Sequence, residues 1–241
     1  MPEGPELKYI NILLQNIIGN NIIHIKTFNK PPLEKITGKI LNVETKGKLT
    51  WIELDKKYIH IHLGLTGWLY IDDEPDNKKY MIKTNKFKIY LDNLATLCIL
   101  TREEHIKKIN KLGIDILTSD FTLEYFKNNL KKSKVMIAPY LLKQDKFAGL
   151  GNYIKNEALY LAKIHPKTKA NKIDENKIEK LYEFIRYVAF SVLATYIKTK
   201  LKNFPKKLQI PYKFKIYNRS KDDDGNIIKK EKINGRTTYY V

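Results

Sequence analysis

The spacing of apolar residues changes near Gly113 in this chain of 241 residues, and the change limits the folds it can adopt. From about Asn21 to Leu100, segments such as YIHIHLGLTGWLYI and FKIYLDNLATLCIL place β-branched and aromatic residues near every second position. This alternation is typical of β-strands. After Gly113 the apolar residues recur at helical spacing, as in NYIKNEALYLAKI and DENKIEKLYEFIRYVAFSVLATYIKTKL. We therefore expect an α+β protein with a β-rich region before a helical one.

Further elements are expected before the strands, at the start of the helical region and at the end of the chain. Pro5–Ile18 has helical spacing and predicts a helix ahead of the strands. In SDFTLEYFKNNLKK, Ser119 or Asp120 is the candidate N-cap of the first helix of the helical region. From Phe204 onward, PYKFKIYN and TTYYV again look like strands, and the polar turn of their hairpin is expected at Asp222–Gly225.

The net charge of +19 indicates a polyanionic partner, because neutralising a polyanion releases its counterions. A lysine-rich coding bias is the alternative source of that charge, since Ile, Lys and Asn are all abundant. The chain has only four arginines, so an arginine in a candidate site is more informative than a lysine.

Cys98 is the only cysteine, which excludes an intrachain disulfide and any zinc site with two or more cysteines. We expect Cys98 to be a small buried apolar residue. His60 and His62 share one strand face, but no third metal ligand is evident, so packing or DNA contact is favoured over a metal. No apolar run reaches the roughly 18–20 residues of a membrane span, and no signal peptide is evident. An intracellular protein without a membrane segment is expected.

The first residues, MPEGPE, place a proline after the initiator methionine and a glutamate after the proline. Methionine is normally removed before so small a residue, which would leave Pro2 with a secondary amine beside the Glu3 carboxylate. An α-amino group has a reference pKa of about 7.7–8.0, so part of it is neutral at cellular pH. The pair is either a nucleophile beside its acid/base or a charged N-terminus that favours the start of a helix.

The segment KQDKFAGLGNYIKNEALYLAKIHP leads from a glycine-containing turn into an amphipathic helix. Backbone N–H groups at such a helix start can hold a phosphate, and Asn152 would add a side-chain amide. An ordinary tight connection between helices is the alternative.

Three motifs together resemble the formamidopyrimidine/endonuclease VIII family of DNA glycosylases: MPEGPE at the start, GLGNYIKNEALYLAKIHP in the middle and NGRTTYYV at the end. Within that family, the segments KFAGLGN, IKNEALY and GIDILTSDF look closest to the vertebrate endonuclease VIII-like enzymes. The resemblance runs from end to end and thins in the strands between the motifs.

The resemblance implies an N-terminal helix with a two-layer β-sandwich domain (residues 1–115). A helical domain with a helix–two-turn–helix (116–203) and a β-hairpin finger (204–241) are expected to follow. The implied activity is that of a bifunctional DNA glycosylase and AP lyase, which excises oxidised bases in base excision repair and cuts the strand by β- and δ-elimination. The resemblance to the vertebrate-like enzymes favours oxidised pyrimidines and hydantoins.

The resemblance also assigns roles. Pro2 would be the Schiff-base nucleophile and Glu3 the acid/base. Glu6 would be a supporting carboxylate that orients the N-terminus at the DNA. Lys48, after Gly47 in KGKLTWIEL, would contact phosphate beside the lesion, with Lys46 as its rival.

Asn152 and Arg236 would hold phosphates, since a guanidinium binds phosphate oxygens in a bidentate manner. The alternative interpretation of Arg236 is a solvated surface arginine on a hairpin. The family's finger is usually a four-cysteine zinc ribbon, so this finger would have to be zincless. Neither a metal nor another cofactor is expected.

HIHLGLTGWLY resembles the family loop that fills the gap left by an extruded base, with Leu65 where methionine is usual. A leucine packed in the β core is the alternative. The family's two other gap-filling residues, an arginine and a phenylalanine, are missing near LDNLATLCIL. A preference for lesions in single-stranded DNA is therefore expected.

The expected partner is damaged DNA, single-stranded or duplex, bound by a monomer inside the cell. The alternative function is a non-catalytic binder of damaged or branched DNA. The intact PEG start favours the enzyme, because a binder has no use for a proline amine.

Overall fold

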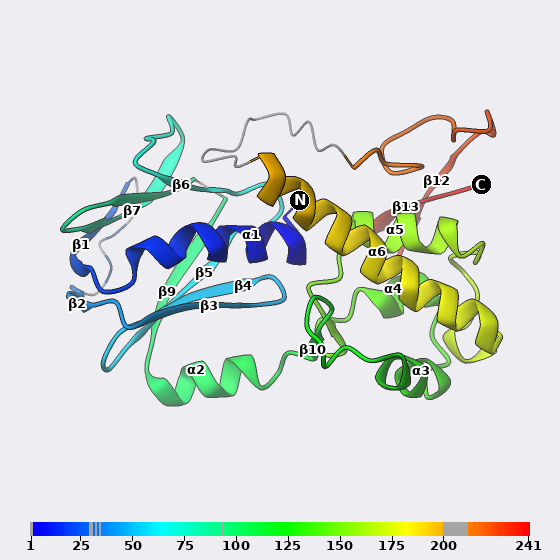
Figure 1. Ribbon diagram of the computed structural model, residues 1–241, viewed down its shortest axis with the longest axis horizontal. Coiled ribbons are helices and arrows are strands. Elements are labelled where there is room, and N and C mark those ends of the chain that lie inside the picture. Colours follow the sequence, from blue (N-terminus) through cyan, green and yellow to red (C-terminus); the bar gives the residue numbers. More distant parts are fainter. Residues whose placement is uncertain (1, 29–30, 32, 34, 93, 200–211) are drawn as a thin grey trace. The chain divides into compact units, whose positions relative to one another are not determined.

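The computed structural model describes residues 2–28, 31, 33, 35–92, 94–199 and 212–241, which form two compact units (Figure 1). The first unit contains Pro2, the described residues of Glu6–Lys111 and the end of helix α6 (Glu175–Thr199) from Tyr196. The second contains the remaining described residues, including Glu3–Pro5. The domain boundaries at 115/116 and 203/204 stay predictions, and the second of them lies outside the described residues.

The first unit is built on two antiparallel sheets. In the four-stranded sheet the strands lie in the order β3 (Asn42–Lys46), β4 (Leu49–Glu53), β5 (Tyr58–His62) and β9 (Thr96–Leu100). In the other sheet the order is β2 (Gly38–Lys39), β1 (Asn21–Thr27), β7 (Lys78–Thr84), β8 (Lys88–Asp92) and β6 (Leu69–Ile71). Every pairing in both sheets is antiparallel, as the alternating sequence pattern suggests.

Helix α1 (Gly4–Leu14) precedes the strands and continues into a short 3₁₀ turn, η1 (Gln15–Ile17). Leu7, Ile10 and Leu14 are at most 1% exposed, because their spacing puts them on one helix face, which packs into the core. The predicted N-terminal helix is therefore present. The α+β fold class is confirmed.

Helix α2 (Arg102–Ile109) is a helix that the strand pattern of residues 21–100 did not predict. Thr101 caps it, accepting a hydrogen bond from the Glu104 N–H, while the Glu104 carboxylate accepts from the Thr101 N–H. This reciprocal pair is a capping box, so the T-x-x-E spacing was a signal available in the sequence.

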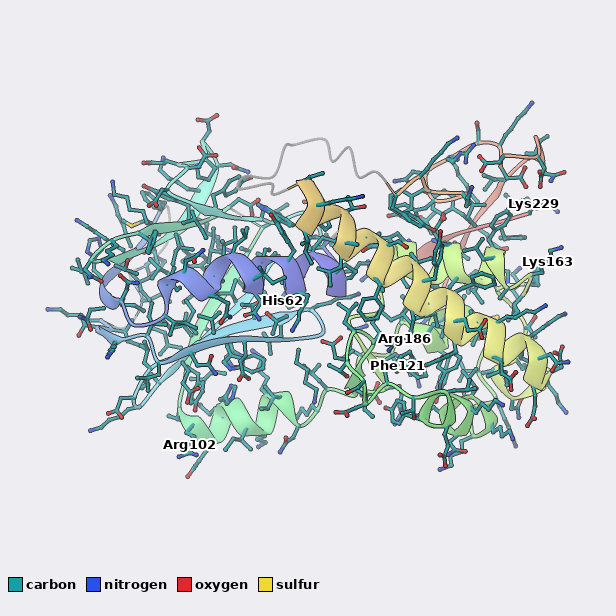
Figure 2. All side chains as sticks on the ribbon, in the orientation of Figure 1. His62, Arg102, Phe121, Lys163, Arg186 and Lys229 are labelled. Carbon is teal, nitrogen blue, oxygen red and sulfur yellow. The ribbon has the colours of Figure 1, made fainter. Side chains whose placement is uncertain are left out.

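The second unit is mainly helical. Its helices are α3 (Leu123–Lys131), α4 (Ile137–Leu141), α5 (Asn152–Leu161) and the part of α6 up to Thr195, with a 3₁₀ turn η2 (Ala170–Lys172) before α6. Strands β10 (Ile114–Asp115) and β11 (Phe147–Ala148) form a short parallel pair. Phe121, labelled in Figure 2, packs edge-to-face against Phe126 and Phe147, and all three rings are fully buried. No helix among the described residues is long and apolar enough to cross a membrane.

The N-cap of α3 is Thr122 rather than Ser119 or Asp120. The Thr122 hydroxyl accepts a hydrogen bond from the Tyr125 N–H at 3.1 Å. The prediction was wrong by two or three residues, because all three side chains are capable caps and the chain before Thr122 turns first.

The terminal hairpin pairs β12 (Lys229–Ile233) with β13 (Arg236–Tyr240). Its turn is Asn234–Gly235, where both residues have positive φ (49° and 76°). An Asn-Gly pair favours such a tight turn. The predicted hairpin turn at Asp222–Gly225 was therefore wrong: those residues form a separate turn, in which the Asp222 carboxylate accepts from the N–H groups of Asp224 and Asn226.

PYKFKIYN was predicted as strand, and its described part, residues 212–218, contains no strand. The earlier residues of the predicted segment, from 204 to 211, lie outside the described residues.

Candidate active site

Glu3 is fully buried in the second unit, at the start of helix α5. Its carboxylate accepts hydrogen bonds from the N–H groups of Tyr153 (2.9 Å) and Ile154 (3.3 Å). The first N–H groups of a helix lack partners within the helix and carry its partial positive charge, so they stabilise a negative group there. The helix start that the sequence suggested for phosphate thus holds Glu3.

Two glycines allow Glu3 to reach this position. A Cβ on Gly151 would lie 2.0 Å from the Glu3 carboxyl carbon, so no other residue fits without displacing Glu3. Gly149 has a φ of 89°, a conformation that glycine adopts without strain, and its carbonyl accepts from the Gly4 N–H at 2.9 Å. The GLG turn is therefore shaped to receive the PEG segment.

One face of α5 is hydrogen-bonded to strand β13. The Asn152 amide donates to the Thr237 carbonyl at 2.9 Å. One turn further along the helix, the Asn156 side-chain oxygen accepts from the Tyr239 N–H at 3.2 Å. The helix that holds Glu3 therefore also fixes the strand that begins with Arg236.

Lys155 lies on the same face and is fully buried. Its ammonium donates to Asn152 Oδ1 and to Thr238 Oγ1, both at 2.9 Å. Burial lowers the pKa of Lys155 to about 8, the Glu3 charge opposes that shift, and Arg236 adds to it. The Glu3, Lys155 and Arg236 charges therefore lie close enough together to influence one another.

Glu157, also fully buried, organises the segment before the hairpin. Its carboxylate accepts from the N–H groups of Lys215 (2.8 Å), Ile216 (2.9 Å) and Tyr217 (2.9 Å). Those residues form a turn rather than the predicted strand because their N–H groups converge on one carboxylate. Among the described residues, no group of three or more His, Cys, Asp or Glu side chains is arranged to hold a metal ion.

Arg236 is exposed and follows the Asn234–Gly235 turn directly. The structure thus brings together three of the residues singled out in the sequence, Glu3, Asn152 and Arg236, around one helix of the second unit. Asn152 is only 8% exposed and its amide is engaged by Thr237, so here it positions the finger strand.

Lys48 belongs to the first unit and lies in the two-residue turn between β3 and β4. Gly47, with a φ of 60°, supplies the turn conformation, and Lys48 is half-buried. Its rival Lys46 donates to the Ile109 carbonyl at 3.4 Å, a contact within the unit's own structure. Lys48 remains the predicted phosphate contact, with Lys46 as the alternative.

Leu65 lies in the turn that joins β5 to β6 and is 55% exposed. The Gly67 N–H closes this turn on the Leu63 carbonyl at 2.9 Å, while Gly64 has a φ of 66°. The exposure of Leu65 does not fit the alternative of a leucine packed in the β core.

Glu6 and Pro2 also belong to the first unit, and both are buried. The Glu6 carboxylate accepts from the Tyr196 hydroxyl at 3.0 Å. Burial, together with the Glu6 charge, raises the pKa of Tyr196. The burial of Glu6 (4% exposed) favours its supporting role at the N-terminus over direct contact with DNA.

Of the two histidines on strand β5, His60 is a packing residue. His60 is buried and its Nε2 lies 2.8 Å from Nδ1 of His105, whose ring stacks on Tyr58 at 3.9 Å. His62 is exposed. Cys98 was expected to be buried and is only half-buried, with the Lys108 ammonium 3.5 Å from its sulfur, because it faces α2 across the edge of the sheet.

Sequence reasoning missed Lys155, Asn156 and Glu157. A signal was present, because Asn152, Lys155 and Asn156 recur at helical spacing within an otherwise apolar helix. Polar residues on a buried helix face need partners, and here the finger supplies them.

Comparisons with known proteins agree with this geometry. Residues 1–102 match the formamidopyrimidine-DNA glycosylase N-terminal domain, and residues 112–202 match the formamidopyrimidine-DNA glycosylase H2TH domain. The chain belongs to the formamidopyrimidine-DNA glycosylase family. The resemblance carried by MPEGPE, GLGN and NGRTTYYV is thereby confirmed, and the protein is an enzyme of the DNA glycosylase and AP lyase class.

Two relatives and two structures illustrate the extent of the match. The formamidopyrimidine-DNA glycosylase of Herpetosiphon aurantiacus is 30% identical over 78% of this chain and 77% of its own length. That of Pelotomaculum thermopropionicum is 28% identical over 100% and 97%. The LlFpg protein, solved with a THF-DNA and an inhibitor, is 25% identical, with coverage of 100% and 98% and a TM-score of 0.85. Lactococcus lactis Fpg, solved with an oxidized pyrimidine containing DNA, is 24% identical, with coverage of 99% and 97% and a TM-score of 0.84.

Proposed function

We propose that this DNA glycosylase removes oxidised bases, pyrimidines and hydantoins before others, and then cuts the strand, with Pro2 as nucleophile and Glu3 as acid/base. The observation that carries the proposal is the buried Glu3 carboxylate, held by two N–H groups at the start of α5. A carboxylate that served only to favour the start of its own helix would not need a contact about 150 residues away along the chain.

Pro2 acts once Met1 has been removed, because only then is its nitrogen an amine. The amine attacks C1′ of the damaged nucleotide, the bond from C1′ to the base breaks, and the base leaves with that electron pair and takes up a proton. Protonation of the ring oxygen opens the sugar and leaves an iminium between Pro2 and C1′. Loss of a C2′ proton expels the 3′ phosphate by β-elimination, and δ-elimination then expels the 5′ phosphate.

Glu3 moves the protons in this sequence. It is covalently next to Pro2, so its carboxyl group lies within reach of the sugar that Pro2 attacks. The N–H groups of Tyr153 and Ile154 hold the carboxylate in one orientation, and Gly151 leaves room for it. This geometry suits delivery of a proton to the ring oxygen followed by removal of one from C2′.

The partner is damaged DNA inside the cell, and its phosphates meet cationic groups of this chain. Arg236 is exposed at the end of a short rigid turn, which suits a bidentate phosphate contact. Lys48 supplies a second cation from the β3–β4 turn. Asn152 supports the arrangement by fixing the finger strand.

Leu65 is proposed as the residue that fills the gap left by the extruded base. The segment LDNLATLCIL contains neither an arginine nor a phenylalanine, so the two other gap-filling residues of the family are missing there. A single apolar wedge supports the orphaned partner base poorly, which favours single-stranded substrates.

The test uses protein processed at Met1, a single-stranded oligonucleotide with one oxidised pyrimidine, and borohydride to reduce the iminium. We expect a covalent protein–DNA product on a denaturing gel, and none from protein that retains Met1. Absence of the product on this oligonucleotide and on an abasic one would instead favour a non-catalytic binder of damaged DNA. Robust strand cutting by Met1-retaining protein would contradict the Pro2 mechanism.

The strand preference has its own test, because Leu41 matches Leu65 in residue type and in exposure (48% and 55%). The wild-type protein should cut the lesion faster in a single strand than in a duplex, and L65A should lower the duplex rate further while L41A leaves it unchanged. A wild-type duplex rate well above the single-strand rate would overturn the preference.

A further inference from the structure

Lys155 is a fully buried lysine in the second unit, and the mechanism described above does not use it. Lysine is among the residues least often fully buried, because its charge loses water there. Replacing it by an apolar residue would remove that cost, so its presence at this position calls for a role. Its contacts point to that role.

The Lys155 ammonium begins a chain of hydrogen bonds that ends on the backbone of Arg236. Lys155 Nζ donates to the Thr238 hydroxyl at 2.9 Å, and that hydroxyl donates to the Arg236 carbonyl at 3.3 Å. The same ammonium donates to Asn152 Oδ1 at 2.9 Å, and the Asn152 amide donates to the carbonyl of Thr237. Both branches therefore fix the start of β13, where Arg236 projects.

The charged groups around Lys155 are Glu3, at the start of α5, and Arg236, at the start of β13. Tyr217 lies in the segment before the hairpin and is also close enough to Glu3 to be affected by its charge. Burial is the main cause that raises the pKa of Tyr217, and the Glu3 charge raises it further. Lys155 is thus the cation between the proposed acid/base and the finger arginine. A cation there offsets the Glu3 charge and is itself repelled by Arg236.

We propose that Lys155 is a positioning residue for strand cutting, which aligns Arg236 with the Glu3-bearing end of α5 through the Thr238 hydroxyl. This inference rests on the proposed function, since it concerns the residues that carry that function. Lys155 itself does not touch DNA, because its side chain is fully buried.

The proposal predicts a specific loss of activity at alkaline pH. A protonated Lys155 makes stronger hydrogen bonds than a neutral amine, and burial lowers its pKa to about 8. The rate of strand cutting should therefore fall as the pH rises through about 8. Deprotonation of the Pro2 amine would by itself raise that rate, because the neutral amine is the nucleophile. The alkaline decline should vanish in K155M and move to higher pH in K155R, because guanidinium stays charged.

The experiment compares wild type, K155M, K155R, T238V and the exposed-lysine control K180M, all processed at Met1, on a single-stranded abasic oligonucleotide. K155M and T238V should each slow single-turnover cutting by about tenfold, the size of one hydrogen bond to a charged group. K155M added to R236A should slow it no further, since both act through Arg236. K180M should cut like wild type.

A second measurement does not depend on enzymatic activity. Amide hydrogen exchange of residues 236–240 should be faster in K155M and T238V than in wild type and K180M. If wild type forms no borohydride product, the proposed function fails, and the exchange rates still decide whether Lys155 holds the finger. Unchanged exchange in K155M, additive losses in K155M/R236A, or an alkaline decline that persists in K155M would each overturn the inference.

Discussion

Glu3 and Lys48 are both proposed to act at one damaged nucleotide, yet the structure holds them in different ways. Glu3 is fully buried, and its carboxylate accepts from the N–H groups of Tyr153 and Ile154, about 150 residues away along the chain. Lys48 is half-buried in a two-residue turn whose shape comes from its neighbour Gly47. The proposed acid/base is thus held by tertiary contacts, while the lysine proposed to bind phosphate is placed by local structure.

The difference follows from what each group has to do. An acid/base must keep a fixed distance and orientation to the reacting atoms, and small displacements are costly in rate. A cation that binds phosphate acts through a longer-ranged and more tolerant attraction, so a turn suffices to place it. Changes at Glu3 should therefore cost more activity than changes at Lys48.

The largest expected effect is that of E3Q. The substitution keeps the size of the side chain but removes its proton-transfer capacity, so cutting should fall by about 10²–10⁴-fold. Its matched control is E124Q, which changes an exposed acid in the first turn of α3. Single-turnover cutting of the abasic oligonucleotide measures both. Equal rates for E3Q and wild type would end the acid/base assignment.

A smaller loss is expected from K48M. Removal of one charged phosphate contact should weaken cutting by about 10–100-fold, chiefly through weaker DNA binding that also depends less on salt. K46M is the control, because Lys46 contacts the Ile109 carbonyl within its own unit. Binding measured at several salt concentrations distinguishes the two lysines. A greater loss in K46M would transfer the role to Lys46.

G151A tests whether tertiary contacts set the position of Glu3. The added methyl would lie 2.0 Å from the Glu3 carboxyl carbon, whereas in G4A it would lie 3.1 Å from the Gly149 Cα. We expect G151A to lower the free energy of unfolding by about 1–3 kcal/mol and to slow cutting, with a milder effect for G4A. Denaturant unfolding and the cutting assay provide the comparison. Activity retained in G151A would show that Glu3 can act from another position.

The smallest expected effect concerns stability in acid and lies away from the proposed chemistry. Burial lowers the pKa of His60 from 6.5 to about 4, with further lowering from Lys108 and His105. Between pH 6.5 and about 4 the unfolded chain therefore binds more protons at His60 than the folded chain does. The contribution of neutral His60 to the free energy of unfolding is fully present above about pH 6.5 and is lost as the pH falls toward 4. The loss by pH 5 should be about 2 kcal/mol. Thermal unfolding at pH 7 and 5 measures it, and H60F should lack this component.

The sequence by itself determined the elements with strong local signals. The alternation in residues 21–100 and the helical spacing after Gly113 gave the fold class, because burial of one face imposes a period of two on strands and 3.6 on helices. The three motifs gave the family and the candidate residues Pro2, Glu3 and Arg236, and the resemblance then pointed to Lys48 in KGKLTWIEL. Where several local signals competed, as at Ser119, Asp120 and Thr122, the position chosen was wrong.

Only the tertiary structure decided how these residues are held. No local pattern could show that the Glu3 carboxylate occupies the start of α5, that Glu157 gathers the N–H groups of residues 215–217, or that Lys155 reaches Thr238. Each contact joins segments more than 50 residues apart, and a buried polar group is satisfied by whichever donor or acceptor the fold brings to it. The motifs therefore supply the candidate groups, and the packing of α5 against Glu3, Gly4 and the finger holds Glu3 and the start of β13 in place.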